Sequence, residues 1–311
     1  GQLYALGDGR LHVSQDHGDT WQISSSTDSE ALSFAAEPFP GGRLYLGSKG
    51  GWLSTSRDGG ESWRVVADGL RHADITCLVA DPRTPGLAYL GTLYNGLHRT
   101  NDGGENWTLA SGTLGRPVVM ALVQDPVDPD QFFAGTLDGV YRSDDGGERW
   151  KLASEGVGKA FIQGLAVSSI GDRIYAGGRL GIYLSEDGGA TWHWLEEGTG
   201  GIAVFNVVID PQDEDRIYAG SWGHNVLRST DGGRTWAPIH HGLETLSVHA
   251  FAVDPSDSQR LYAGTVEALY RSTDGGESWK ASPPTERPLT TFALAVDPVD
   301  PAVVYLSLIH I

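Results

Sequence analysis

The chain has 311 residues, of which 40% are hydrophobic, and a formal net charge of −18 from 40 acidic and 22 basic side chains. This acidic balance argues against a nucleic-acid backbone or an anionic membrane as partner. No run of about 20 apolar residues is present, so we expect no membrane span, and the single cysteine, Cys77, excludes an intrachain disulfide.

The chain begins at Gly1 with the alternating stretch QLYALG at residues 2–7, which is typical of a short strand. Because neither an initiator methionine nor a signal peptide precedes this strand, we expect the true N-terminus to lie upstream. We expect an extracellular or periplasmic location for the whole protein.

Next comes the motif Ser/Thr-x-Asp-x-Gly-x-x-Trp, which occurs seven times with 42 to 44 residues between successive tryptophans. A catalytic motif is seldom needed seven times in one chain, whereas a structural unit is. A fixed period near 43 residues predicts a repeat architecture, and this length suits a four-stranded propeller blade. The carboxylates and indoles of the motif are Asp16, Trp21, Asp58, Trp63, Asp102, Trp107, Asp145, Trp150, Asp187, Trp192, Asp231, Trp236, Asp274 and Trp279.

Each repeat contains four strand-length runs rich in Val, Ile, Tyr and Phe and bounded by Gly, Pro and Asp. Examples are VVIDP at 207–211, RIYAGS at 216–221 and ALYRST at 268–273. We name the strands A, B, C and D, with the motif in the C–D turn. No segment has a convincing period of 3.6 residues. The predicted fold is therefore all-β, a seven-bladed propeller of four-stranded antiparallel blades.

The motif itself reads as a turn followed by a plug. Its glycines, such as Gly232 and Gly233, supply backbone conformations that other residues reach only with strain. The Asp231 carboxylate and the Ser229 hydroxyl accept hydrogen bonds from turn amides. Trp236 then fills the gap between neighbouring sheets, which removes about 150–250 Å² from water and contributes roughly 4–6 kcal/mol as an upper estimate. We therefore interpret the motif as structural.

Strand counting predicts how the ring closes. Runs of type A, C and D occur seven times each, whereas type B occurs eight times, from QLYALG to VVYL at 303–306. We expect the last A run, from Phe292, to join the N-terminal B, C and D runs in one blade. The final B run then either competes for that blade's second position or begins a continuation of the protein. We predict one propeller over residues 1–305, as a fragment of a longer protein.

The last six residues, LSLIHI at 306–311, depart from the repeat, which would continue with a sequence such as AGT. They equal the translation of a common transposon-adapter DNA. We interpret them as a non-native tail at the edge of an environmental gene fragment and exclude them from the fold.

The seven motifs resemble the Asp-box (bacterial neuraminidase) repeats of sialidases, xyloglucanase-like glycoside hydrolases, the luminal domain of sortilin and the photosystem II assembly propeller. The resemblance covers nearly the whole chain and is specific for architecture, not for function. It implies that the boxes lie on the outer C–D turns, away from the ligand face. No box residue is therefore carried over as functional.

In a propeller the A–B and C–D turns share one face, and the B–C loops and D–A connections share the other, where ligands usually bind. The A–B turns are acidic, as in DPVDPD at 125–130 and DPQDED at 210–215, so we expect most negative charge on the box face. Their spacing differs from the Ca²⁺ loop Asp-x-Asp-x-Asp-Gly. We expect no metal and no cofactor.

The B–C loops vary while the framework stays constant, and aromatic rings beside amides suit a sugar face or a peptide backbone. The alternative is that these residues cap blade cores or decorate short turns. We predict a monomeric, non-catalytic binding or scaffolding propeller that recognises a protein or a glycan on this face. The ligand-face candidates are Trp52, Tyr94, Arg179, Trp222, His224, Asn225 and His249.

A xyloglucanase-like β-glycan hydrolase is the main alternative. Its chemistry needs two carboxylates across a cleft, and the candidates are Asp74, Asp138 and Glu267. The long loops of such a cleft are missing, and that family's box, RTDVGGAYRW, is not matched at any of the seven positions.

Two further chemistries were weighed. A sialidase needs an arginine cluster, for which only Arg71, Arg116 and Arg179 are placed, and the Phe-Arg-Ile-Pro motif is absent. A metal site built from the His240–His241 pair with His249 lacks the helical His-x-x-x-His spacing. Both fit the sequence less well than a binding propeller.

Overall fold

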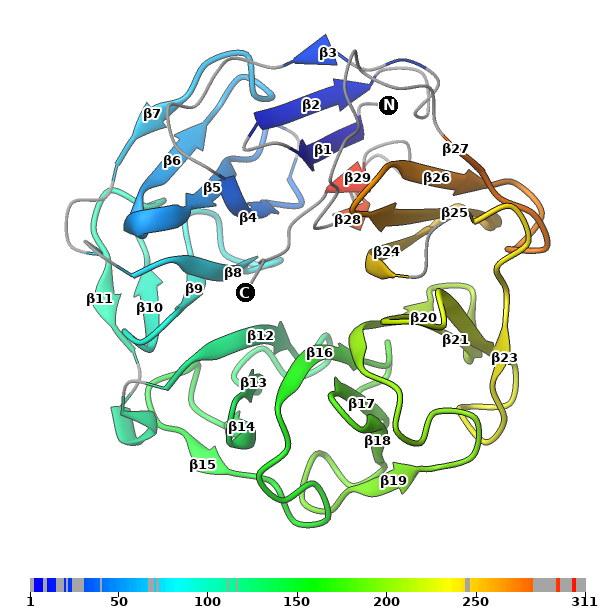
Figure 1. Cartoon of the computed structure of the whole chain (residues 1–311). Coiled ribbons are helices and arrows are strands. Elements are labelled where there is room, and N and C mark those ends of the chain that lie inside the picture. Colours follow the sequence, from blue (N-terminus) through cyan, green and yellow to red (C-terminus); the bar gives the residue numbers. More distant parts are fainter. Residues whose placement is uncertain are drawn as a thin grey trace.

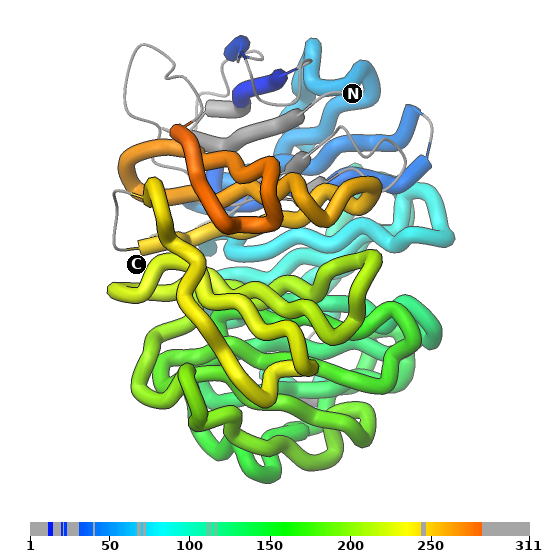
Figure 2. Tube along the Cα trace, turned by 90° about the vertical axis from the view of Figure 1, so that its right-hand side faces the viewer, coloured from blue at the N-terminus to red at the C-terminus, as the bar shows by residue number. Residues whose placement is uncertain are grey.

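The computed structural model describes residues 3–7, 10–14, 20, 22–23, 31–39, 41–66, 70, 73–110, 112–115, 117–243, 247–281, 295–296 and 304–305. They form a ring of small antiparallel sheets around a central axis (Figure 1). Seen from the side, the strands run across the thickness of the ring (Figure 2). The protein is an all-β propeller, as the repeats predict.

Six sheets have four strands, and we number these blades 1 to 6 in chain order. The innermost strands, A, are β4 (Ala31–Ala36), β8 (Ile75–Ala80), β12 (Val119–Gln124), β16 (Ile162–Val167), β20 (Val204–Asp210) and β24 (Val248–Asp254). The B strands are β5 (Leu44–Ser48), β9 (Ala88–Thr92), β13 (Phe132–Thr136), β17 (Ile174–Gly178), β21 (Asp213–Ser221) and β25 (Asp257–Thr265).

The outer half of each blade is shorter. The C strands are β6 (Leu53–Ser56), β10 (Leu97–Thr100), β14 (Gly139–Ser143), β18 (Gly181–Ser185), β22 (Val226–Ser229) and β26 (Leu269–Ser272). The D strands are β7 (Arg64–Val65), β11 (Thr108–Leu109), β15 (Lys151–Leu152), β19 (His193–Leu195), β23 (Ala237–Pro238) and β27 (Lys280–Ala281). Two 3₁₀ turns, η1 (Lys49–Gly51) and η2 (Gly112–Leu114), complete the elements of this part.

The prediction of seven four-stranded blades is wrong for the described residues, which form six such blades. The remaining strands make a three-stranded sheet and a separate pair. The sheet is β1 (Leu3–Gly7), β2 (Arg10–Ser14) and β3 (Gln22–Ile23), and the pair is β28 (Ala295–Val296) with β29 (Val304–Tyr305). The reason is that β28, the last A-type strand, pairs with the surplus B-type strand β29. Asp16, Trp21, Phe292 and the tail 306–311 lie outside the described residues.

A repeated small residue lets each blade pack closely on the next. Strands β5, β9, β13 and β17 are buried along their whole length. Each has a glycine next to its last residue, and a methyl group there meets the neighbouring A strand: at Gly47 it lies 2.5 Å from Ile75, and at Gly91 2.8 Å from Val119. The glycine before the last residue of these B strands is thus a packing requirement.

The Asp boxes lie between strands C and D and close on themselves by hydrogen bonds. In blade 5 the Ser229 hydroxyl donates to Asp231 at 2.8 Å and accepts from the Gly233 amide at 2.8 Å. Asp231 also accepts from the Thr235 amide at 2.9 Å and hydroxyl at 2.6 Å. Gly232 and Gly233 have φ values of 72° and 88°, which other residues adopt only with strain.

Acid should weaken these turns. The Thr235 hydroxyl, followed by its amide, lowers the pKa of Asp231 to about 2. The pKa of an Asp side chain in an unfolded chain is about 3.9. Because the folded pKa is the lower one, this carboxylate stabilises the fold above about pH 4, and its contribution disappears as the pH falls toward 2.

We expect the melting temperature of Asp231→Asn to fall less steeply than that of wild type between pH 4 and pH 2, since the variant lacks one of the titrating groups. Thermal unfolding followed by circular dichroism at half-unit steps measures this slope. Parallel curves for the two proteins would show that the Asp231 carboxylate adds nothing to the acid sensitivity.

Candidate functional site

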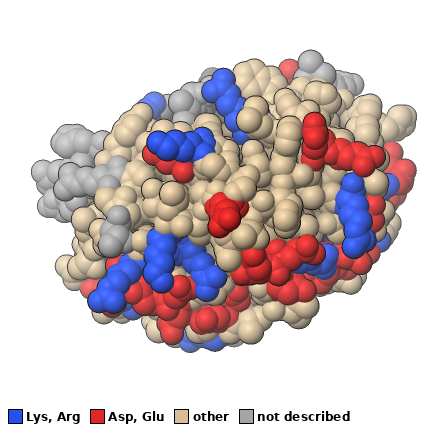
Figure 3. All heavy atoms as spheres, turned by 90° about the horizontal axis from the view of Figure 1, so that it is seen from below, with Lys and Arg blue, Asp and Glu red and all other residues tan. Residues whose placement is uncertain are grey.

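The two faces of the ring carry different side chains. The A–B turns and the boxes share one face, because the Gly232 amide donates to the Asp215 carbonyl at 2.9 Å and the Gly146 amide to the Asp130 carbonyl at 2.9 Å. Figure 3, which shows the ring edge-on, has many acidic and basic side chains gathered along its lower border. The B–C loops and D–A connections lie opposite the boxes, and we call that side the B–C face.

The B–C face presents a crown of apolar side chains, with one exposed large residue from the B–C loop of each blade. The three four-residue loops each carry an aromatic ring, and the shorter loops carry aliphatic side chains. The members of this apolar crown are Trp52, Tyr94, Leu137, Leu180, Trp222 and Val266. Exposed apolar side chains are normal singly, but a set repeated around one face indicates an interaction surface.

Trp222 belongs to a stack of three rings. It lies on Phe205 with 6.4 Å between ring centroids, and Phe205 lies on His249 with 4.6 Å between centroids and 17° between planes. Phe205 comes from β20 and His249 from β24, the innermost strands of blades 5 and 6. The stack therefore runs from a B–C loop across the channel-side edge of two blades.

Phe205 is a site residue that sequence analysis missed. It is the second residue of strand A, where each of the six blades has a β-bulge, for example between Val204 and Asn206. A bulge re-aims the side chain of the extra residue. Aligning the repeats could have drawn attention to Phe205, because the bulged residue occupies the same position in each repeat. The bulged residues are Leu32, Thr76, Met120, Gln163, Phe205 and His249.

The ligand-face candidates divide into exposed and buried ones. Trp52, Tyr94, Arg179, Trp222 and His224 are exposed on the B–C face, and His249 is half-buried in the ring stack. Asn225 is buried, and its carbonyl accepts bonds from the Ser221 amide and hydroxyl. The structure therefore places Asn225 inside the loop that carries Trp222, and not on the exposed surface.

The three carboxylates nominated for hydrolysis lie in different blades. Asp74 precedes β8 and accepts from the Gly50 amide at 2.7 Å, so it ties the loop of blade 1 to its neighbour. Asp138 lies in the β13–β14 loop and Glu267 in the β25–β26 loop.

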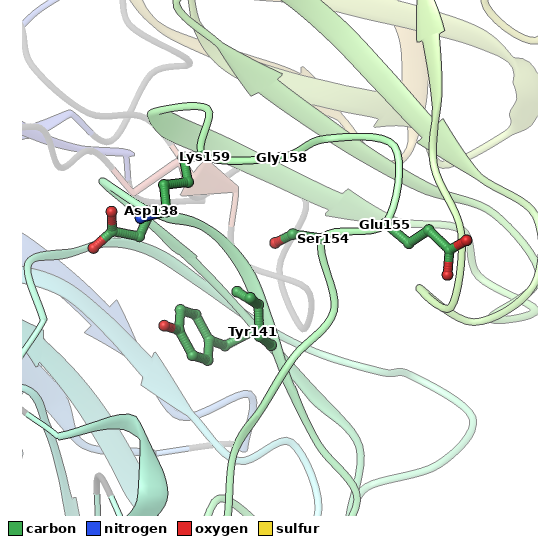
Figure 4. Close-up of a pocket in the computed structure, with 7 residues that line it drawn as sticks. Asp138, Tyr141, Ser154, Glu155, Gly158 and Lys159 are labelled. Atoms are coloured by element: carbon green, nitrogen blue, oxygen red, sulfur yellow. The ribbon is translucent and has the colours of Figure 1, made fainter.

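Asp138 lines a shallow pocket of about 450 Å³ at the edge of blade 3. Figure 4 shows Lys159 beside Asp138 and the ring of Tyr141 on the same side, whereas Glu155 points away from them. Acid–base hydrolysis needs two carboxylates that converge on one bond, about 5–9.5 Å apart. The lining residues of the pocket are Asp138, Tyr141, Leu152, Ser154, Glu155, Gly158 and Lys159.

In the described part of the chain, no three His, Cys, Asp or Glu side chains are grouped so that they could hold a metal ion. The same residues contain no helix that is long and apolar enough to cross a membrane. Of the arginines weighed for a sialidase site, Arg71 and Arg116 lie outside the described residues.

Comparison with known proteins supports the architecture. The BNR/Asp-box repeat family model matches residues 270–281, which hold the last box. No curated protein matches the chain. The fold is that of known propellers.

Three solved structures illustrate the likeness. The GH74 xyloglucanase from Xanthomonas campestris has a TM-score of 0.74 and 17% identity, over 94% of this chain and 53% of that one. YCF48 bound to a D1 peptide has a TM-score of 0.65 and 17% identity, over 84% and 85%. The extracellular domain of BT4673 from B. thetaiotaomicron has a TM-score of 0.60 and 18% identity, over 90% and 38%. The chain thus spans about half the length of the xyloglucanase.

Proposed function

We propose that this protein is a non-catalytic binding or scaffolding propeller that recognises a protein or a glycan through its B–C face. The apolar crown carries the proposal, because it places one exposed apolar side chain of each four-stranded blade on the same face of the ring. The YCF48 structure with a D1 peptide shows that a propeller of similar fold binds a polypeptide.

A closed ring is part of this proposal. We propose that residues 1–305 form one propeller whose seventh position is shared by both ends of the chain. In support, β29 lies beside β1, and β28 lies beside β24. Closure in this way would hold blades 1 and 6 in place and keep the crown continuous. We also propose that the protein is monomeric and acts outside the cytoplasm, which the extracellular domain of BT4673 supports by analogy of fold.

Removing the Trp222 ring tests the binding function. We expect Trp222→Ala to weaken binding at least about tenfold, since exposed aromatic residues on a ligand face are frequent hot spots. The probes are a glycan array and a phage-displayed library of 12-residue peptides, followed by titration of each binder. Ile170→Ala is the matched control, because Ile170 is equally exposed but lies in an A–B turn on the box face.

Binders that are indifferent to Trp222→Ala would contradict the proposal. The β-glycan hydrolase remains the alternative, favoured only by Asp138 in its pocket and by the likeness of fold to GH74. Release of reducing sugar from xyloglucan, abolished by Asp138→Asn, would establish the alternative instead.

A further inference from the structure

Tyr94 occupies a position where the fold otherwise uses glycine. The four-residue B–C loops of blades 1, 2 and 5 all adopt a positive φ at their second residue: 74° at Gly50, 72° at Tyr94 and 81° at Gly223. Only glycine adopts this conformation freely, and a bulky residue there is strained. Among the described residues, Tyr94 and Asn225 are the two non-glycine residues with positive φ.

Burial of the Tyr94 side chain does not compensate for the strain of its backbone. The side chain is 71% exposed, the highest value among the large apolar residues of the described chain. A strained and solvent-exposed aromatic residue in place of glycine gains nothing for folding that glycine would not supply. Strain of this kind is typical of functional sites. We therefore infer that the aromatic ring of Tyr94 has a function on this surface.

Tyr94 and Trp222 bound a stretch of the apolar crown on blades 2 to 5, which we call the apolar arc; Trp52 on blade 1 and Val266 on blade 6 lie beyond it. Blade 3 contributes Leu137, blade 4 contributes Leu180, and blade 5 contributes Trp222, which is 66% exposed. The strands that carry the two aromatic ends, β9 and β21, lie on opposite sides of the ring in Figure 1. The apolar arc therefore has an aromatic ring at each end and aliphatic side chains between.

From this arrangement we propose that Tyr94 and Trp222 anchor the two ends of one extended polypeptide segment that lies along the apolar arc; this deepens the function proposed above and depends on it. The aliphatic middle favours a polypeptide over a glycan, because Leu137 and Leu180 can bury apolar side chains of a peptide, whereas a sugar offers none. The formal charge of −18 favours a segment that is neutral or basic.

Peptides selected from the phage-displayed 12-residue library on the wild-type protein are the probe. Their dissociation constants are measured by fluorescence anisotropy on wild type, Tyr94→Gly, Trp222→Ala and Ile170→Ala. We expect apolar residues near both ends of the peptides, a loss of at least about tenfold for Tyr94→Gly and for Trp222→Ala, and no change for Ile170→Ala. A peptide shortened at one end should become insensitive to one of the two substitutions and stay sensitive to the other.

The melting temperature of Tyr94→Gly separates a ligand contact from a structural role. We expect it to equal or exceed that of wild type, since glycine relieves the strained φ. A clear fall would overturn the proposal, as would peptides that are indifferent to Tyr94→Gly, recovery of no peptide, or Tyr94-dependent binding of xyloglucan oligosaccharides without peptide binding.

The outcomes also separate this proposal from the function on which it rests. Binders that are sensitive to Trp222→Ala but not to Tyr94→Gly overturn the two-ended contact and leave a binding propeller. If neither a peptide nor a glycan binds in a way that depends on Trp222, both proposals are overturned.

Discussion

Replacing Trp192 by alanine should lower the free energy of unfolding by about 3–5 kcal/mol. Trp192 is 3% exposed and packs with Phe133 and Tyr183 in the cluster between blades 3 and 4. Its indole Nε1 donates to the carbonyl of Ala153, in the preceding blade, at 2.8 Å. The substitution therefore leaves both a cavity and a carbonyl without its donor at a contact between two blades.

A second box tryptophan provides the comparison. Trp236 is only half-buried, and its indole donates to the carbonyl of Gly233 in its own turn at 2.9 Å. We expect Trp236→Ala to destabilise the protein clearly less than Trp192→Ala, because it breaks no indole bond between blades. Urea unfolding followed by circular dichroism measures both midpoints. Equal shifts of the midpoint would contradict the idea that inter-blade bonding distinguishes the boxes.

The sequence predicts the boxes themselves, but it does not predict this difference among them. The period of 42 to 44 residues and the alternating runs predict a propeller of four-stranded blades because each repeat is one unit that must bury its faces against neighbours. All seven boxes have the same pattern, yet Trp150, Trp192 and Trp279 are buried and donate to the preceding blade. How deeply a Trp inserts depends on the approach of the preceding blade, which no local motif encodes.

The candidate site shows the same limit at single residues. Tyr94 and Trp222 stood out as aromatic residues in variable loops, and the structure exposes both. Asn225, which directly follows the exposed His224, was expected beside them but is buried. Phe205 was not predicted because it was interpreted as an ordinary strand residue. Its exposure to the site follows from a bulge, and that bulge depends on how β20 pairs with β21. The positive φ of Tyr94 likewise follows from loop closure and not from its residue type.

In blades 2 to 5 the approach of the next blade also depends on a glycine that follows the D strand, and Gly156 makes the shortest such contact. Its φ is 95°, and a methyl group on it would lie 2.0 Å from the carbonyl oxygen of Trp192 and 2.9 Å from the carbonyl carbon. These are backbone atoms, held by the bond from the Trp192 amide to the Glu155 carbonyl at 2.8 Å. A side chain at residue 156 must therefore push two blades apart.

Gly156→Ala should accordingly lower the free energy of unfolding by roughly 2–5 kcal/mol, as the sum of backbone strain and overpacking. Gly158→Ala is the matched control, because Gly158 also has a positive φ of 64° but has no atom within 4 Å of the added methyl group. It should lose only the strain, about 1–2 kcal/mol. The urea midpoints of the two variants test this prediction. If Gly158→Ala were as destabilising as Gly156→Ala, backbone strain alone would explain both results. The close approach of the D–A connection to the next box would then not be what holds adjacent blades in register.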